Sequence, residues 1–453
     1  MLNLMNKLQT TVLAVMLLLA MAATAQDSQQ RSNIYDMSID DVVKRFATFK
    51  KTAATKVFKI GKTGFPTLGF FYEGRALAQD ANLGTYVIDT KGNILKTWDK
   101  NLDMIGSIPT INAPHFSSGR MVFIEVTKPD FVKEAVIYDL DMHEVARFKN
   151  VSSASQFVDG IALITQVDRS EIYAKKTTFF IDVNGNRVLQ EFSNLYAGVD
   201  GEILPSYIRP LREGLSAFGI PVQEGRIRKT LWGFRDKAGK VIIQPKYTVV
   251  HNFVNGLCAV RTGNNTTSLW GFIDTNGNEV IPLQFAKEPS DFDECGVAVV
   301  QDSERKYRLL NRKGEMGEER MLLITAFNKG RAIMADMDGI RMVDNKLNVI
   351  TLFNDLPDSP LGGVKSVVSH NAANYMQLKG IYIQEGVFMA HMKGVNYPNG
   401  IGSAQLDANG NVVMAGLSGP FVNGIAPVIC KNLNEIGYVN EKGEWVVKYE
   451  RGD

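Results

Sequence analysis

One sequence unit recurs along this chain, and its two clearest copies are adjacent in the middle. Each copy starts with a Trp-Gly pair, runs through apolar residues to an Asp-x-x-Gly segment and reaches a proline. Self-similarity of this kind is typical of repeat architectures, in which each unit buries its apolar face against its neighbours. The shared residues are Trp232, Gly233, Asp236, Gly239 and Pro245 in the first copy, and Trp270, Gly271, Asp274, Gly277 and Pro282 in the second.

Weaker copies extend the array in both directions. Their Asp or Asn anchors stand 33 to 63 residues apart, a drift that loop insertions produce in a unit of about 40 residues. A second landmark, an aromatic residue three positions before a glycine, precedes most anchors, and the side chain two positions after that glycine is usually small. The anchors are Asp89, Asp139, Asp182, Asp236, Asp274, Asn311, Asp344, Asp407 and Asn440, and the small residues are Ala76, Ala162, Ser216, Cys258, Ala332 and Ala426.

The Asp-x-x-Gly segments predict hairpins. Asp favours the first position of a type I turn, and Gly favours the fourth, where a positive φ closes a hairpin with a bulge. Because proline cannot donate to a strand ladder, we expect Pro245 and Pro282 to end the second strand. Residues 253–260 predict a third strand with its small residue on a crowded inner face, and residues 247–251 predict a short fourth strand.

Three or four short strands in about 40 residues fit one blade of a β-propeller. We therefore expect an all-β repeat protein, a propeller-like array of about nine units with three to four strands each. Trp232 and Trp270 are expected to pack between neighbouring units. An open β-solenoid of hairpins would show the same pattern, so the sequence leaves that alternative open.

The N-terminal region differs from the repeats. Residues 1–25 resemble a secretory signal peptide, with a basic start, an apolar run over 12–23 and small residues before the expected cleavage site. The protein is therefore expected to be exported to the periplasm, the cell surface or the medium, with no membrane-spanning segment after cleavage. Within residues 26–60, the apolar spacing predicts an amphipathic helix over 38–51. The repeat array is expected over 61–453.

Charge and composition argue against several classes of partner. The chain has 50 Lys and Arg against 48 Asp and Glu, so it lacks the basic excess expected of a nucleic-acid-binding protein. The five histidines show no zinc spacing, and the Asp-x-Asn-Gly segments place Gly too early for a calcium loop. No metal or other cofactor is therefore expected. Cys258 and Cys295 could join adjacent units by a disulfide, but two small buried side chains are the favoured interpretation.

Two stretches exceed the repeat period, near 194–230 and 354–400. Insertions in repeat proteins form loops, and binding residues often lie on loops held by a rigid scaffold. The second stretch is also long enough to contain one degenerate unit, which is the favoured alternative. The candidate ligand-binding side chains in these stretches are Tyr196, Tyr207, Tyr375, Tyr382 and Tyr397.

In its two Trp-Gly units, with the aspartate, glycine and proline at matching positions, the chain resembles the WG-repeat (KWG-repeat) family of bacterial proteins. The resemblance implies an exported or surface-associated β-rich protein and supplies no active site. We therefore expect a non-enzymatic binding or scaffold protein of the bacterial envelope that holds a protein or a glycan. The alternative is a polysaccharide-acting enzyme with its site at one mouth of a propeller. Recurring aspartates could supply a carboxylate pair, but a turn role accounts for all of them together.

Overall fold

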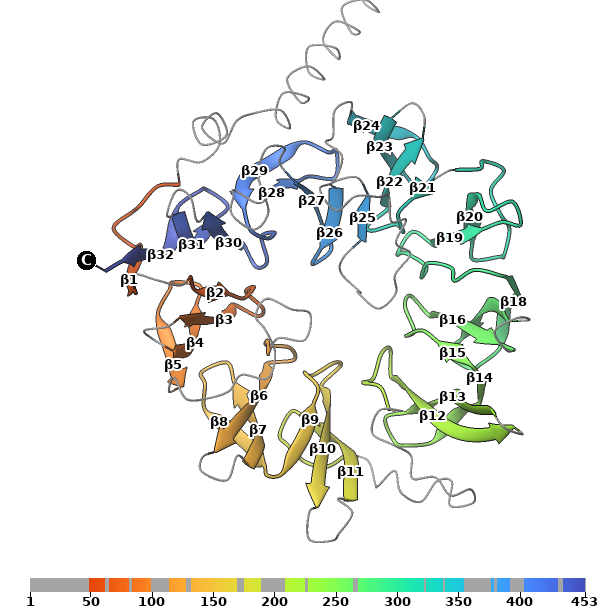
Figure 1. The fold of residues 1–453 in the computed structure, drawn as a ribbon, viewed down its shortest axis with the longest axis horizontal. Coiled ribbons are helices and arrows are strands. Elements are labelled where there is room, and N and C mark those ends of the chain that lie inside the picture. The colour runs from red at the N-terminus through yellow and green to blue at the C-terminus, as the bar shows by residue number, and fades with distance from the viewer. Residues whose placement is uncertain are drawn as a thin grey trace, which may run out of the picture.

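The computed structural model shows a closed ring of small β-sheets around a central opening (Figure 1). The part of the chain that the structure describes forms 32 strands in nine sheets and no helix. The structure describes residues 49–452 except for 62–64, 81–83, 99–113, 128–131, 169–174, 189–207, 225–226, 264–267, 322, 337–338, 354–375, 379–380, 392–402 and 431–434. The expected signal peptide therefore lies outside the described residues.

The sheets follow one another in chain order, and we number them in that order. Sheet 1 contains β2 (Thr67–Leu68), β3 (Arg75–Asp80), β4 (Gly84–Asp89) and β5 (Ile94–Trp98). Sheet 2 contains β6 (Arg120–Thr127), β7 (Val132–Asp139) and β8 (Glu144–Phe148). Sheet 3 contains β9 (Val151–Ala154), β10 (Ile161–Asp168) and β11 (Lys175–Asp182).

The two Trp-Gly units form the outer strand pairs of sheets 4 and 5. Sheet 4 contains β12 (Leu215–Glu224), β13 (Ile227–Asp236) and β14 (Val241–Tyr247). Sheet 5 contains β15 (Val249–Val250), β16 (Leu257–Thr262), β17 (Leu269–Asp274) and β18 (Glu279–Phe285). The expected third and fourth strands of this unit correspond to β16 and β15. Sheet 6 contains β19 (Val297–Gln301) and β20 (Tyr307–Asn311).

The last three sheets complete the ring. Sheet 7 contains β21 (Leu323–Ile324), β22 (Arg331–Asp336), β23 (Gly339–Asp344) and β24 (Val349–Phe353). Sheet 8 contains β25 (Met376–Leu378), β26 (Ile381–Gln384), β27 (Val387–His391), β28 (Ser403–Leu406) and β29 (Val412–Leu417). Sheet 9 contains β30 (Ile425–Cys430), β31 (Glu435–Asn440), β32 (Trp445–Arg451) and β1 (Lys56–Ile60).

Strand β1 closes the ring, because it pairs in parallel with β32 at the edge of sheet 9. The chain therefore joins its first and last described strands in one sheet, as Figure 1 shows at the left of the ring. The expected array began at residue 61, whereas the structure includes residues 56–60 in the ring. Closure also resolves the alternative of the open solenoid in favour of a propeller.

The predicted helix over 38–51 lies outside the described residues except for its last three. Those residues are not helical: Lys50 forms a parallel bridge with Glu444, and Phe49 packs edge-on against Trp445 with ring centroids 5.3 Å apart. This end of the prediction was wrong because contact with the last sheet, which local periodicity does not encode, fixes the backbone here.

An apolar cluster fills each of the nine junctions between consecutive sheets. The landmark aromatic residue of one sheet often packs onto an aromatic residue in the preceding sheet. Phe253 contacts Phe234, and Phe292 contacts Phe272, both with ring centroids 4.8 Å apart in edge-on geometry. The small residues of the repeat are fully buried on the inner strands, as the sequence predicted.

The landmark glycine belongs to a two-residue turn in which both residues have positive φ. In sheet 1 these residues are Glu73, with φ of 50°, and Gly74, with φ of 77°. Two consecutive positive φ values define the type I′ hairpin turn, in which glycine is favoured at the second position. Similar pairs occur at Ser118-Gly119, Asp159-Gly160, Glu213-Gly214, Asn255-Gly256, Lys329-Gly330, Glu385-Gly386 and Asn423-Gly424.

Both prolines lie inside strands, so the prediction that they end a strand was wrong. Pro245 is part of β14 and Pro282 is part of β18, and each strand is the last in its sheet order. A strand at the edge of a sheet tolerates proline because its outward-facing positions donate no ladder bond. The ladder also shifts register opposite Gly233 and Gly271, the glycines of the Trp-Gly pairs.

The stretch 354–400 contains the degenerate unit that the sequence allowed. Strands β25, β26 and β27 lie within it, and Glu385-Gly386 supplies its I′ turn. Phe388 stands two positions after that glycine, where most units have a small side chain, so the unit was hard to recognise.

Cys258 and Cys295 are both free thiols, so no disulfide joins their units. The expectation of two small buried side chains holds for Cys258 but was wrong for Cys295, which is exposed in the turn before β19.

Candidate functional site

The recurring aspartates hold hairpin turns together. Asp274 accepts the backbone N–H groups of Asn276 and Asn278 through Oδ1, at 2.9 and 2.8 Å, and the Asn278 amide through Oδ2. Burial alone would raise the pKa of Asp274, but these hydrogen bonds outweigh it and lower the pKa. The same pair of backbone contacts occurs at Asp89, Asp139, Asp182, Asp236, Asn311, Asp344, Asp407 and Asn440.

The two tryptophans of the Trp-Gly pairs lie at sheet junctions. Trp270 is buried among residues of sheets 5 and 6, including Phe285 and Phe292. Trp232 is partly exposed and packs against the cluster between sheets 4 and 5. The guanidinium carbon of Arg209 lies 4.5 Å from the Trp232 ring centroid, within cation–π range.

The five candidate binding tyrosines are not brought together by any described contact. Tyr196, Tyr207, Tyr375 and Tyr397 lie outside the described residues. Tyr382 lies on β26, within the degenerate unit of sheet 8 and not in an inserted loop.

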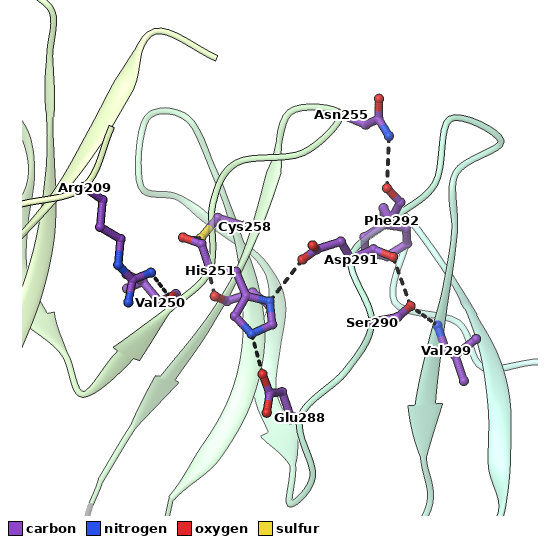
Figure 2. A network of polar contacts seen from close by, with 11 residues as sticks. Arg209, Val250, His251, Asn255, Cys258, Glu288, Ser290, Asp291, Phe292 and Val299 are labelled. Atoms are coloured by element: carbon purple, nitrogen blue, oxygen red, sulfur yellow. Dashed lines mark hydrogen bonds and ion pairs between the residues drawn. The ribbon is translucent and has the colours of Figure 1, made fainter. Parts of the chain in front are cut away.

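A network of charged side chains lies instead where sheets 4, 5 and 6 meet (Figure 2). His251 follows β15 directly and is 7% exposed. Its Nδ1 lies 3.0 Å from Asp291 Oδ1, and its Nε2 lies 2.9 Å from Glu288 Oε1. Both carboxylates belong to the segment that connects β18 to β19. The His251 imidazole of sheet 5 thereby holds the segment that leads into sheet 6.

Two carboxylates can accept hydrogen bonds but cannot donate them, so this geometry favours an imidazolium that donates from both nitrogens. Burial alone would lower the pKa of His251, but the bonds to Asp291 and Glu288 outweigh it and raise the pKa. The Trp270 ring lies beside the imidazole, with centroids 5.1 Å apart. We call His251, Glu288 and Asp291 the histidine junction.

Two neighbouring side chains frame the histidine junction. Arg209 donates from Nη1 to the carbonyl oxygen of Val250 at 2.8 Å. Cys258 lies with Sγ 3.3 Å from the carbonyl oxygen of His251, and burial raises the pKa of its thiol well above the ordinary value. Cys258 therefore stays protonated and serves as a small buried side chain.

Sequence reasoning missed the histidine junction, although the repeat contains a signal for it. His251 and Arg209 stand two positions before the landmark residue of their units, where three other units have a hydroxyl side chain and three have glycine or proline. In those three units the hydroxyl oxygen accepts a hydrogen bond from a backbone N–H of the next strand. Leu163 N donates to Ser155, Val299 N donates to Ser290, and Ile333 N donates to Thr325. Arg209 in sheet 4 and His251 in sheet 5 therefore place a polar, ionisable side chain where a hydroxyl group has a structural role in other units.

A second polar cluster lies on sheet 2. Glu125 and Glu134 are direct cross-strand partners on β6 and β7, and both carboxylates accept hydrogen bonds from Arg147 Nη1, at 3.0 and 2.6 Å. Glu125 also accepts from Trp98 Nε1 at 2.8 Å and from the Tyr138 hydroxyl at 2.5 Å. The cluster joins the outer strand of sheet 1 to sheet 2.

In the part of the chain that the structure describes, no group of three His, Cys, Asp or Glu side chains could hold a metal ion.

The comparisons with known proteins bear on the central units. A model of the WG-containing repeat matches residues 232–265 and 270–305. These two units are WG repeats. The matched residues contain the end of β13, all of β14 to β19 except Leu269, both Trp-Gly pairs and the three residues of the histidine junction. The comparison with curated proteins gives no match.

Several solved structures share a general likeness with this chain. A eukaryotic initiation factor is 12% identical, with 86% of this chain and 98% of that chain covered and a TM-score of 0.46. BamB from Moraxella catarrhalis is 11% identical over 75% and 93% of the two chains, with a TM-score of 0.34. The β-propeller domain of the Trilobed protease from Pyrococcus furiosus is 12% identical over 64% and 100%, with a TM-score of 0.33.

The WG repeats and the closed propeller together suggest a repeat-based binding or scaffold role. Among the described residues, no helix is long and apolar enough to cross a membrane.

Proposed function

We propose that the chain is a non-enzymatic binding or scaffold protein of the bacterial envelope, which holds a protein or a glycan on its β-repeat surface. The observation that carries the proposal is the role of the repeated carboxylates. Their oxygens accept backbone N–H groups within their own turns, so the most regular polar residues of the chain maintain its shape. We therefore expect the residues that bind a partner to lie at positions where the units differ from one another.

The envelope location rests on the sequence of residues 1–25, which has the pattern of a signal peptide. Expression of the full chain in a bacterium, followed by fractionation and mass spectrometry, tests it. We expect the product to start at Gln26 and to be found outside the cytoplasm. A full-length product in the cytoplasm would contradict this location.

The alternative of a polysaccharide-acting enzyme needs two carboxylates that face each other across about 5 to 10 Å. Glu125 and Glu134 form one pair of neighbouring carboxylates among the described residues, but Arg147 donates hydrogen bonds to both. A pair of carboxylates that share one arginine is already engaged by charged hydrogen bonds, which suits a structural ion cluster.

One experiment separates binding from catalysis. The purified protein is applied to a glycan array and to an array of envelope proteins, and soluble polysaccharides are incubated with it and analysed for shortened products. Retention without product release supports the proposed function. Product release that is lost in Glu125→Gln, with folding intact, would establish the enzyme alternative instead.

A further inference from the structure

The last strand of each sheet in chain order has one side that no strand of its own unit covers, and we call this side the outer edge. An open edge has a row of unpaired N–H and C=O groups that can pair with another chain. Proteins protect such edges with covering segments, charged side chains, prolines or local distortion of the backbone. Eight of the nine outer edges in the described part of this chain have one of these features.

Other segments cover three outer edges. Strand β1 pairs with β32 in sheet 9. In sheet 6, Tyr307 and Met321 donate backbone N–H groups to each other's carbonyl oxygens, so the segment after β20 returns along that strand. In sheet 3, Val188 donates its backbone N–H to the carbonyl oxygen of Phe180, so the segment after β11 also returns. These three edges are therefore already paired.

Five further outer edges have protection in their own sequence. Charged side chains lie on β5 and β8, prolines interrupt β14 and β18, and β29 contains a glycine whose positive φ of 81° breaks the extended backbone. These residues are Lys96, Glu144, Arg147, Pro245, Pro282 and Gly416.

Strand β24 of sheet 7 is the exception. Its sequence from Val349 to Phe353 contains no charged residue, proline or glycine. Val349 is 53% exposed and Leu352 is 42% exposed, although both side chains are large and apolar. Within the described part of the chain β24 pairs only with β23, and it lies on the outer side of the ring (Figure 1). An exposed apolar edge strand of this kind is a site at which another strand can add.

The sequence of β24 is complementary to itself. A two-fold axis through its middle residue would align two copies antiparallel, and every residue pair formed in this way is uncharged. The pairs are Val349 with Phe353, Ile350 with Leu352, and Thr351 with Thr351. Aromatic and β-branched cross-strand pairs stabilise a sheet, whereas like charges directly opposite destabilise it. The same operation on β5 would place Lys96 opposite its own copy, so β5 is not complementary to itself.

We propose that the outer edge of β24 is an interface between two copies of this chain. The two strands pair antiparallel about Thr351 and join sheet 7 of one ring to sheet 7 of the other. A two-fold contact of this kind closes on itself and leaves no further open edge. Because only five residues of each strand pair, we expect a weak dimer whose population depends on concentration. The interface goes beyond the proposed function and does not depend on it.

Sedimentation velocity of the purified protein over about 5 to 200 µM tests the interface. Leu352→Lys is the test variant. Val280→Lys is the matched control, because Val280 is 39% exposed on β18, an outer strand that contains Pro282. We expect wild type to shift from monomer to dimer as its concentration rises. Leu352→Lys should weaken dimerisation about tenfold or more, and Val280→Lys should change it less than about twofold.

Disulfide trapping tests which residues lie opposite each other. Ile350→Cys and Leu352→Cys are prepared separately in a Cys295→Ser background, since Cys295 is an exposed thiol. Directly opposite strand positions have a spacing that suits a disulfide. We therefore expect an oxidised mixture of the two variants to contain more cross-linked dimer than either variant alone. Thermal unfolding checks that every variant folds.

Three outcomes would overturn the interface. Wild type could stay monomeric at every concentration, Val280→Lys could dissociate as readily as Leu352→Lys, or the mixture could cross-link no more than its components. If wild type stays monomeric but Leu352→Lys loses a protein that wild type retains on the envelope array, the edge binds another polypeptide and not a second copy. Each of these results leaves the proposed function standing.

Discussion

Gly271 lies directly against Pro282 on the neighbouring strand. A Cβ atom added to Gly271 would stand 2.6 Å from the carbonyl oxygen of Ile281 and 2.8 Å from the carbonyl carbon of Pro282. Gly233 has the same relationship to Ile243 and Pro245 in the first WG repeat. The glycine of the Trp-Gly pair and the proline at the end of the unit are therefore two sides of one close backbone contact.

Gly271→Ala is therefore expected to destabilise the protein by about 1 to 3 kcal/mol, because backbone atoms must shift to admit the methyl group. Urea unfolding measures the change. Gly317→Ala is the matched control, since the nearest atom to its added Cβ is 3.7 Å away. Equal effects of the two substitutions would show that the close contact is not what requires glycine.

Gly437 shows how far the sequence could guide such an inference. This degenerate unit has lost the tryptophan and kept the glycine, and an added Cβ there would meet the carbonyl oxygen of Val447 at 2.0 Å. The repeat pattern therefore predicted the strands and the turns well, because both depend on residues close in sequence. It missed strand β1, whose residues pair with β32, and the adjacent Thr55, whose hydroxyl donates to the carbonyl oxygen of Trp445, 390 positions away.

Trp270→Ala is expected to cost about 3 to 5 kcal/mol, because it leaves a cavity between sheets 5 and 6. Trp270 is 4% exposed, whereas Trp232 is only partly buried, so Trp232→Ala is expected to cost less. Chemical denaturation of both variants gives the comparison. A larger loss at Trp232 would contradict the described packing of the two rings.

Gly277→Val is expected to cost about 2 kcal/mol or more, because Gly277 has a φ of 85° that a β-branched residue adopts only with strain. An added Cβ would also lie 3.0 Å from Ile243 in the preceding sheet. Asn276→Ala should cost less than about 0.5 kcal/mol, since Asn276 contributes its backbone N–H to the turn. Melting temperatures of the two variants test the difference.

His251→Gln should destabilise the protein in a pH-dependent way. The folded pKa of His251 is raised above its ordinary value of about 6.5, so folding favours the protonated form. The contribution is therefore complete below about pH 6.5, while the carboxylates are still ionised, and it is lost as pH rises through the folded pKa.

The size of that contribution is modest, about 1 to 2 kcal/mol, because Glu288 and Asp291 are 41% and 36% exposed and solvent screens them. The free energy of unfolding of wild type and His251→Gln is compared at about pH 5.5, 7 and 8.5. A difference that does not shrink toward the highest pH would show that His251 is not held as a cation.

Tyr86 and Tyr449 form a hydrogen bond of 2.6 Å between their hydroxyl groups, buried between sheets 1 and 9. Tyr86→Phe or Tyr449→Phe alone should cost about 1 to 2 kcal/mol, because each leaves the other hydroxyl without this partner. The double variant should cost less than the sum of the two. Thr165→Val in sheet 3 should add independently to either, and strict additivity for the tyrosines would contradict the coupling.

The candidate sites were less predictable than the fold. The histidine junction, for example, combines a residue at a strand end with two residues of a connecting segment. Repeat analysis gives the shared positions of a unit, whereas these residues are departures from it. A search for units whose residue differs from the others at an equivalent position would have selected His251. It would not have selected the partners of His251, Glu288 and Asp291.

The parallel pairing of β1 with β32 also constrains how the protein can be made. Lys56 pairs with Val447, so sheet 9 cannot be completed until β32 has been synthesised, long after β1. Folding routes dominated by such distant contacts are slow, and their unfinished edges are prone to aggregate. The yield of the native molecule is therefore expected to depend on how long the edge of β1 stays unpaired before β32 is available.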